Sequence, residues 1–442
     1  MQIMKKTLIA ATLFFAYAAP LSAQTVPMAP SHGTEPPRSD IRPYASADEA
    51  VANAEGASRY ISPLEKWQRE EKEGETIFST DLVYPLSWLN RQLLLRIEAA
   101  SAGYRIMVNG KETGYASNGA LPTEFNITKY AEQGINRLSV VLNAPQASEP
   151  LLKTGVAWLG AVEAISQPTI RLRDIVYTTR LNDAGDGITE IGLVVKTDAL
   201  NPKQSRISYE LLASDTTRLA YGYKDITLEM RGEDTVKFAT VVPRAELWSA
   251  ENPVILTLVV RNRISGKYAE TVALPIGLRE ETYSDGKIAV NGRPIVLNVA
   301  KAAPNATAAD LAELKRRGYN CVTTDAGEAA TKLYAACDTA GMYAIPQLAV
   351  DTSGGSDSIK RGGNPSNDVA YTDEYTDRAA AMYHTSRNHP SVIAYSLGGG
   401  RTNGINMYEA YLTLKNLERN RPIIYVGAGK EWNNDRTDVR IP

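Results

Sequence analysis

Hydrophobic and polar residues alternate with a period of two through the first large region of the chain. Segments such as "RQLLLRIEAA", "YRIMVNGKETGYA" and "NRLSVVLNA" show this alternation and are separated by turn residues, which predicts β-strands. The dipeptide Asn109–Gly110 favours a tight two-residue hairpin. We therefore expect residues 57–166 to form a jelly-roll sandwich.

The alternation continues through residues 167–280, with a different spacing of the turns. About seven strand-like segments follow one another here, from "TIRLRDIVYTTRL" to "YAETVALPIGL", as expected for an immunoglobulin-like sandwich. The region contains no cysteine pair, which excludes the disulfide-linked antibody type of domain. A second all-β domain is therefore predicted.

The period changes after residue 281, where apolar segments alternate with segments of helical pattern. The segments "PIVLNVA", "CVTTD", "MYAIPQLAV", "VIAYSLGG" and "PIIYVGAG" are predicted strands, and a predicted helix follows each of the first four. This order indicates parallel βα units, with "TDVRIP" as the start of a sixth strand. Because the sequence ends at Pro442, we expect residues 281–442 to form an incomplete TIM-type (β/α) barrel. The predicted fold class is multidomain β plus α/β.

The N-terminal region has the pattern of a targeting segment followed by a linker. In residues 1–23, two lysines precede an apolar run and a small residue at Ala23, which indicates a secretory signal peptide. The apolar run is too short to cross a bilayer. We therefore expect an exported protein without a transmembrane span, periplasmic, associated with the cell envelope, or secreted. Residues 24–56, rich in Pro and Ser, are predicted to be a flexible linker with a short helix capped by Ser46 and Glu49.

Composition and charge narrow the classes of partner. The 48 Lys and Arg and the 50 Asp and Glu give a net charge of −2, and no basic cluster exceeds Lys315–Arg317, so nucleic acid is not an expected partner. With three histidines and no Cys/His cluster of ligand spacing, we expect no metal and no cofactor. Cys321 and Cys337 form either a disulfide or two separately buried thiols.

Longer motifs occur in an order that resembles one enzyme family. They are "SRYISPLEKWQ", "YRIMVNGKETGYASNGALPTEFNITKYAEQGINRLSVVL", "ELWSAENPVILTLVV", "LREETYSDGKIAVNGRPIVLNVA" and "RNHPSVIAYSLG". Through most of residues 57–442 the chain resembles glycoside hydrolase family 2, the β-galactosidase and β-glucuronidase group. The resemblance implies a retaining glycosidase, in which one carboxyl group protonates the leaving oxygen and a second attacks the sugar.

The positions that carry the family's chemistry hold other residues in this sequence. The resemblance places the family's Asn–Glu pair, a sugar contact and the general acid/base, at Gly399 and Gly400, and glycine cannot transfer a proton. The nucleophile would follow on a strand beyond Pro442. The segments "NVAKAAPNA" and "TTDAGEA" lack the family's His and Arg, "KTGVAW" lacks its sugar-binding carboxylate, and the metal-binding segment keeps an acid at Asp351. We therefore expect a pseudoenzyme without catalytic residues.

Five polar residues remain at or just beyond the ends of predicted barrel strands, where barrel enzymes place their sites. They are Asp325, Gln347, Asp351, Arg401 and Asn403. One interpretation is a residual ligand pocket. The other, which we favour because no pair has catalytic spacing, is a set of solvated loop residues. His384 is expected to pack within its helix, and His389 to stabilise a turn.

Three functions are compatible with the sequence. The first is an exported non-catalytic scaffold or binding subunit, with a protein partner docked on the open half-barrel, where unpaired strand edges need cover. The second is a secreted carbohydrate-binding protein that uses Tyr and Trp side chains of the jelly roll. The third is a glycosidase completed by a second polypeptide, in which Gly400 would still leave the acid/base absent.

We predict that the mature protein begins at Gln24. Signal peptidases require a small residue before the cleaved bond, so Ala23→Arg should accumulate as the uncleaved precursor. Intact-mass spectrometry of both proteins from the native host measures this directly, and a wild-type chain that retains Met1 would contradict the prediction.

Overall fold

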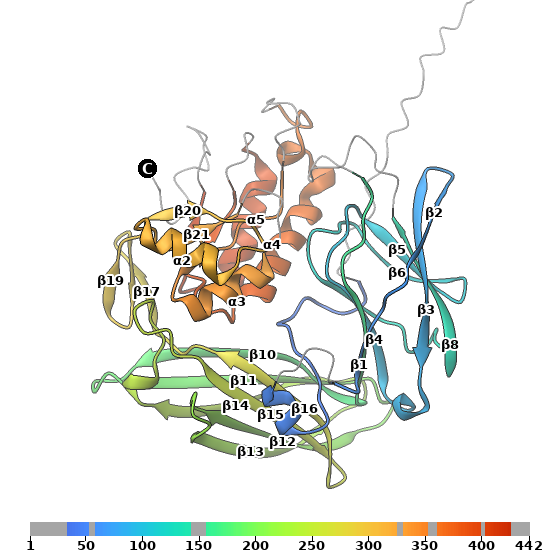
Figure 1. Cartoon of the computed structure of the whole chain (residues 1–442), viewed down its shortest axis with the longest axis horizontal. Helices are drawn as coiled ribbons and strands as arrows, with labels where there is room; N and C mark the ends of the chain where they lie inside the picture. Colours follow the sequence, from blue (N-terminus) through green and yellow to red (C-terminus); the bar gives the residue numbers. More distant parts are fainter. Residues whose placement is uncertain are drawn as a thin grey trace, which may run out of the picture.

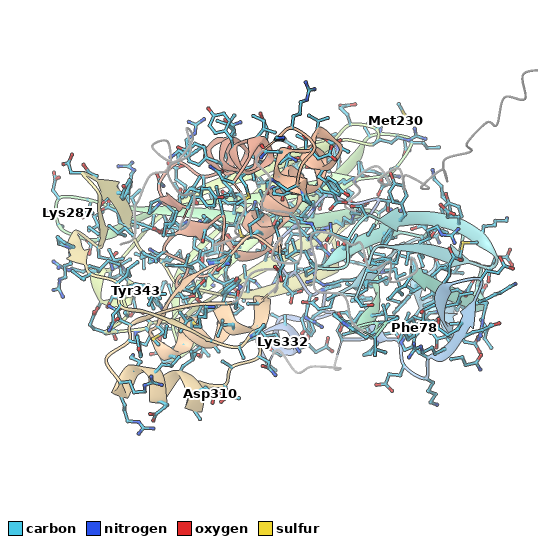
Figure 2. All side chains as sticks on the ribbon, turned by 90° about the horizontal axis from the view of Figure 1, so that it is seen from above. Phe78, Met230, Lys287, Asp310, Lys332 and Tyr343 are labelled. Atoms are coloured by element: carbon cyan, nitrogen blue, oxygen red, sulfur yellow. The ribbon has the colours of Figure 1, made fainter. Side chains whose placement is uncertain are left out.

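The two alternating regions and the βα region fold as three packed modules (Figure 1). The computed structural model describes residues 33–52, 58–142, 156–324, 330–351, 360–398 and 403–425. The jelly roll is blue to cyan, the immunoglobulin-like sandwich is green to yellow, and the barrel region is orange to red. Figure 2 shows Phe78 of the jelly roll and Lys287 of the barrel entry at opposite ends of the molecule.

Two sheets form the jelly roll, with strand orders β1-β9-β4-β7 and β2-β3-β8-β5-β6. The strands are β1 Ile61–Pro63, β2 Gln68–Lys72, β3 Glu75–Tyr84, β4 Gln92–Ile97, β5 Tyr104–Val108, β6 Lys111–Ala116, β7 Thr123–Asn126, β8 Gly134–Leu142 and β9 Val162–Gln167. A short 3₁₀ turn, η1 Leu86–Trp88, follows β3. Alternate residues of β5 are buried in the core, as the period of two predicted. Asn109 and Gly110 both have positive φ angles and join β5 to β6, which confirms the predicted hairpin.

The immunoglobulin-like sandwich has sheets β10-β11-β14 and β13-β12-β15-β16. Its strands are β10 Ile170–Leu181, β11 Gly187–Thr197, β12 Lys203–Leu212, β13 Arg218–Leu228, β14 Glu233–Val242, β15 Leu256–Ile264 and β16 Lys267–Ile276. The turn η2 Arg244–Glu246 follows β14. Side chains from both sheets pack into one core, which includes Leu193, Ile207 and Leu258. The predicted two-sheet arrangement is therefore present.

The barrel region contains parallel strands with helices between them. The strands are β20 Val299–Lys301, β21 Cys321–Thr323, β22 Tyr343–Ile345, β23 Tyr395–Ser396 and β24 Ile423–Ile424. The helices are α2 Ala308–Arg316, α3 Thr331–Ala340, α4 Thr372–Ser386 and α5 Ile405–Leu417, with short turns η3 Pro365–Asn367 and η4 Val369–Tyr371 before α4. Parallel bridges from Ala344 to Val392 and from Gln347 to Ser396 connect β22 to β23. The strands of the described residues form no closed ring, as expected for an incomplete barrel.

The predicted first barrel strand, "PIVLNVA", is divided between two sheets. Its first residues belong to β19 Arg293–Ile295, which pairs antiparallel in a small sheet with β17 Glu281–Ser284 and β18 Lys287–Val290. Only Val299–Lys301 joins the barrel sheet. Asn298 separates the two parts, because its backbone N–H donates to Asn320 Oδ1 and its side-chain amide to Gly318 O. The predicted sixth strand, "TDVRIP", lies outside the described residues.

The predicted flexible linker contains a segment that is packed between the domains. Residues 33–44 are largely buried, and this segment is called the N-terminal arm below. Its apolar anchors Ile41 and Tyr44 are 1% and 2% exposed. The predicted short helix is present as α1 Ala47–Ala52, and the Glu49 backbone N–H donates to Ser46 Oγ. Composition indicated a loose segment, whereas tertiary contacts order the part of it that the structure describes.

Charged side chains attach the N-terminal arm to all three modules. Arg38 Nε donates to Glu124 Oε2 of the jelly roll at 2.8 Å, with both side chains at most 6% exposed. Ser39 N donates to Asp174 Oδ1 of the immunoglobulin-like domain at 3.2 Å. From the barrel region, Asn388 Nδ2 donates to Ser39 Oγ at 2.7 Å. The arm is therefore a common structural element of the three domains.

Cys321 on β21 and Cys337 on α3 are both buried and free, which agrees with the two-thiol alternative. Burial raises the pKa of both thiols, so they stay protonated and unreactive. None of the helices in the described part of the chain is long and apolar enough to cross a membrane.

We predict that Arg38→Ala lowers the free energy of unfolding by roughly 3 kcal/mol, because it leaves the carboxylate of Glu124 buried without its closest cation. The matched control is Arg69→Ala, which removes an exposed ion pair with Glu71 and should lower the free energy of unfolding far less than Arg38→Ala. Urea unfolding followed by tryptophan fluorescence measures both values. Equal losses in the two variants would contradict the prediction.

Candidate functional site

The carboxyl ends of the parallel strands form the face on which barrel enzymes place their catalytic groups. The described residues that follow these strands are 302–306 after β20, 324 after β21, 346–351 after β22, 397–398 after β23 and 425 after β24. Four of the residues expected at a site lie outside the described part: Asp325, Gly399, Gly400 and Arg401. Gln347, Asp351 and Asn403 are described.

Gln347 lies where three strands end side by side. A parallel bridge joins it to Ser396, and Leu348 N donates to Ser396 O at 2.8 Å. Thr323 Oγ1 donates to Ile345 O at 3.0 Å and lies 3.4 Å from Gln347 Oε1. The structure therefore brings Gln347 together with Thr323 of β21, a neighbour that the sequence prediction did not name.

Gly398, two residues beyond β23, packs directly against Gln347. Its φ angle is +90°, a backbone conformation that favours glycine, and a Cβ atom there would lie 3.3 Å from Gln347 Nε2. Its N–H donates to Ser396 Oγ at 3.0 Å. Gly398 thus packs against the amide of Gln347 two residues after β23 ends.

Asp351 is buried in the segment after β22, and α4 holds this segment in place. Arg378 Nη1 donates to Ala349 O at 2.6 Å, and Arg378 Nε donates to Glu374 Oε2 at 3.2 Å. Asn118 of the jelly roll lies 3.5 Å from the same Glu374 oxygen. The jelly roll thus supports the loop that carries Asp351.

Asn403 has a structural position at the start of α5. Its Oδ1 accepts from Gly404 N at 2.8 Å, and its carbonyl accepts from Asn367 Nδ2 at 3.1 Å. The side chain is 6% exposed. These contacts close the loop before α4, which favours the structural interpretation of Asn403 over a ligand contact.

Retaining glycosidases need two carboxyl groups about 5 Å apart. Among the described residues that directly follow the barrel strands, Asp351 is the one carboxylate. The described residues contain no group of three His, Cys, Asp or Glu side chains that could hold a metal ion. The described polar groups Thr323, Gln347 and Asp351 include one carboxylate, so these three residues do not contain the pair of acids that a retaining glycosidase uses.

A second cluster of charged groups lies between the immunoglobulin-like domain and the barrel region. Tyr177 Oη donates to Asn388 O at 2.6 Å, and a hollow of about 330 Å³ opens beside this contact. His389 Nδ1 lies 2.6 Å from Asp338 Oδ2, and Asp338 Oδ1 accepts from Ser391 N at 2.9 Å. These bonds support the predicted turn role of His389.

His384 also has the packing role that the sequence indicated. Its ring lies against Tyr383, with the ring centroids 5.3 Å apart. Its Nδ1 contacts the Arg387 guanidinium, which also pairs with Asp174. His384 therefore lies in a packed interdomain contact and not at the ends of the barrel strands.

Glu281 is the notable ionisable group of this interface, and no sequence pattern predicted it. Its side chain is 9% exposed, and its Oε2 pairs with Arg279 Nη1 at 2.7 Å. Its second oxygen is buried and makes no hydrogen bond within the described residues. Burial raises the pKa of Glu281 to about 7, although Arg279 and Arg421 act in the opposite direction.

Three family models match successive parts of the chain, in the order found in the structure. The "sugar binding domain" of glycosyl hydrolases family 2 matches residues 53–153, the central "Glycosyl hydrolases family 2" model matches residues 170–279, and the "TIM barrel domain" of that family matches residues 284–441. Together they span most of the sequence.

Similar proteins give the same family. A β-galactosidase of Pectobacterium atrosepticum is 26% identical over 379 residues, which cover 80% of this chain and 36% of that protein. A β-galactosidase of Psychromonas ingrahamii is 24% identical over 393 residues, which cover 83% of this chain and 37% of that protein. The chain thus spans little more than a third of the length of these relatives.

Solved structures share the fold. A β-glucuronidase of Bacteroides uniformis superposes with a TM-score of 0.67 at 20% identity, over 80% of this chain and 46% of that one. A family 2 member of Bacteroides cellulosilyticus superposes with a TM-score of 0.70 at 18% identity, over 82% of this chain and 48% of that one.

We predict that Glu281→Gln makes stability less dependent on pH. The pKa of Glu281 is about 7 in the folded chain against an ordinary value of 4.5, so the folded state binds more protons between these values. Stability therefore decreases as the pH rises from about 4.5 to about 7, and stays lower above it. We expect Glu281→Gln to exceed the wild type by up to about 3 kcal/mol at pH 8 and to match it near pH 4.5.

Thermal unfolding at a series of pH values measures this difference. The control is Glu112→Gln, which changes a carboxylate whose side chain is half exposed on the jelly roll. If the stability of the wild type rises from pH 5 to pH 8 relative to that of Glu281→Gln, the raised pKa of Glu281 is wrong.

Proposed function

This chain belongs to glycosyl hydrolases family 2, and from that premise we propose that it acts as a non-catalytic binding or scaffold protein. The observation that carries the proposal is the pair Gly399–Gly400. The family resemblance places the sugar-contacting Asn and the acid/base Glu at these two positions. Without a proton donor the leaving oxygen departs unassisted, a loss of roughly 10²–10⁴-fold in rate from this step alone.

The described residues that precede the two glycines support the same proposal. Gly398 has a positive φ angle and packs against Gln347, and Thr323 Oγ1 lies 3.4 Å from Gln347 Oε1, so no acid is among these side chains. The family's Arg and His positions after β21 are occupied by the sequence "TTDAGEA". One substitution would be compatible with an altered mechanism, whereas the replacement of several groups together favours a role without hydrolysis.

The proposed role includes export. The pattern of residues 1–23 supports secretion to the periplasm, the cell envelope or the medium. A protein partner on the open side of the half-barrel stays a prediction, and gentle purification from the native host followed by crosslinking would test it. A monomer with no crosslinked partner would exclude it.

A glycosidase completed by a second polypeptide is the alternative function. The retained order of all three family 2 domains favours it, and so do the β-galactosidases and β-glucuronidases among the similar proteins. Under this alternative, the second chain would need to supply both an acid/base and a nucleophile. Co-expression with any neighbouring reading frame that encodes barrel strands would separate the two functions.

We predict no turnover of nitrophenyl β-galactoside, β-glucuronide, β-mannoside or β-glucoside above the rate without protein. The double variant Gly399→Asn/Gly400→Glu should stay inactive, because it restores only the acid/base. Asp351 is the one carboxylate that directly follows the described strands, and the resemblance assigns it to the metal-binding segment and not to the nucleophile. Release of nitrophenol over a long incubation is the measurement.

The control for this assay is Asp351→Asn, which removes that carboxylate while it conserves the size of the side chain. Wild-type turnover that Asp351→Asn abolishes would refute the non-catalytic role. Turnover that Asp351→Asn leaves unchanged would indicate a contaminating hydrolase and would leave the prediction standing.

A further inference from the structure

The sheet β13-β12-β15-β16 has an outer face that points away from the barrel region (Figure 1). Helix α1 contacts β15 and β16 and covers part of that half of the sheet, while Arg263 of β15 and Tyr268 of β16 stay exposed. The β12–β13 half has no such cover among the described residues. The side chains on the outer face of β12 and β13 are therefore accessible to a ligand.

Two tyrosines lie side by side on the exposed half. Tyr221 and Tyr223 of β13 are 53% and 51% exposed, and their ring centroids are 6.4 Å apart. Since residues two apart on a strand project from the same face, both rings lie on this face, with their planes tilted by 44° to each other. Neither ring is needed to fill the core, which the opposite face supplies through Ile207, Tyr209 and Leu211.

Arginines hold these rings in place. The Arg206 guanidinium lies 4.5 Å from the centroid of the Tyr223 ring and pairs with both carboxylate oxygens of Asp225, at 2.7 and 2.8 Å. The Arg218 guanidinium lies 5.7 Å from the centroid of the Tyr221 ring and pairs with Glu210. Cation–π contacts and ion pairs thus limit the motion of both tyrosines before any ligand arrives.

Positive charge exceeds negative charge on this face. The cross-strand register brings four arginines together with two carboxylates, a surplus of two positive charges. The arginines are Arg206, Arg218, Arg261 and Arg263, and the carboxylates are Asp225 and Glu210. The whole chain has a net charge of −2, so this surplus is local.

Arg263 is the arginine of this set that forms no ion pair within the described residues. Its Nε donates to Gly266 O at 2.7 Å, and its guanidinium lies 5.7 Å from the centroid of the exposed Tyr268 ring. It lines a hollow of about 520 Å³ together with Arg206, Asp225 and hydroxyl groups such as that of Thr227. The hollow therefore offers a guanidinium fork for an anionic group beside hydrogen-bonding side chains.

We propose that this face binds an acidic polysaccharide, with sugar rings stacked on Tyr221 and Tyr223 and a carboxylate or sulfate group bound by Arg263. The apolar face of a pyranose matches a tyrosine ring, and its hydroxyl groups match the surrounding polar side chains. A single-stranded nucleic acid would also stack on aromatic rings. It carries a phosphate at every nucleotide, however, and two surplus charges provide little of the basic groove that such a ligand requires.

This inference deepens the binding role proposed above, but the residues that carry it lie on the immunoglobulin-like domain. A glycosidase with an intact barrel site could have the same surface. Failure of the proposed non-catalytic role would appear as turnover, and failure of this inference would appear as absent or unselective binding.

The test uses the complete mature protein and matched pairs of polymers. Polygalacturonate and its methyl ester differ in the carboxylate, dextran sulfate and dextran differ in the sulfate, and oligothymidylate represents single-stranded nucleic acid. Affinity electrophoresis at low and high salt gives the dissociation constants. We expect binding to polygalacturonate, dextran sulfate or both, weak binding to the two neutral polymers, and loss of affinity as salt screens the arginines.

Variants then locate the site. Tyr221→Ala/Tyr223→Ala should weaken binding of the acidic polymer about tenfold or more, and Arg263→Gln about tenfold. Arg69→Gln removes an exposed arginine of the jelly roll and is the control that should bind like the wild type. Trp158→Ala removes an exposed ring from the jelly-roll segment "KTGVAW" and tests whether the polymer binds there instead. Arg263→Gln changes an exposed side chain, so it tests the site even if the double tyrosine variant does not fold.

Four results would overturn the proposal. They are absence of binding to both acidic polymers, equal affinity for the neutral partners, tighter binding of oligothymidylate, and loss of binding in Trp158→Ala with no effect of the Tyr221/Tyr223 and Arg263 variants.

Discussion

The buried ion pair of Arg38 and Glu124 fixes the N-terminal arm, the segment that contacts all three modules. Burial alone would raise the pKa of Glu124, but Arg38 and Arg96 hold it below its ordinary range, so the carboxylate stays charged inside the protein. A buried charge is tolerated only beside a partner of opposite sign. Because Ser39 of the same arm contacts both other modules, this one pairing restricts how all three can pack.

The constraint extends to the ends of the barrel strands through α4. The chain of contacts Asn118, Glu374, Arg378 and Ala349 joins the jelly roll to the segment after β22. The apolar contact of Ala120 and Leu121 with Ala349 and Ala381 accompanies it. The strand ends therefore have a defined geometry that comes from packing, and no carboxylate pair is needed to maintain it. A scaffold of this kind can persist under a binding role.

Local pattern predicted the strands, the helices and the hairpin at Asn109–Gly110, because the periods of two and 3.6 are properties of neighbouring residues. It failed for the N-terminal arm, since the partners that bury Arg38 lie far along the chain. It also missed the division of "PIVLNVA", which the amide contacts of Asn298 produce. At the candidate site, the predicted end of a strand was enough to identify Gln347. Its contact with Thr323 could not be predicted, because it depends on the register between two strands. Asp325, Arg401 and the glycine pair lie outside the described residues, so their predicted positions stay predictions.

Catalytic carboxylates lower the stability of the folded state, because an active site must hold polar groups in positions that suit the reaction and not packing. Under the non-catalytic role that we propose, selection would no longer keep such groups in place. The outer face of β12 and β13, in contrast, does carry a group of aromatic and charged residues. Tyr221 and Tyr223 expose large rings to water and contribute little to the core, and their described contacts are cation–π contacts at the surface. The anionic ligand that we propose would account for exposed rings and arginines on the same face.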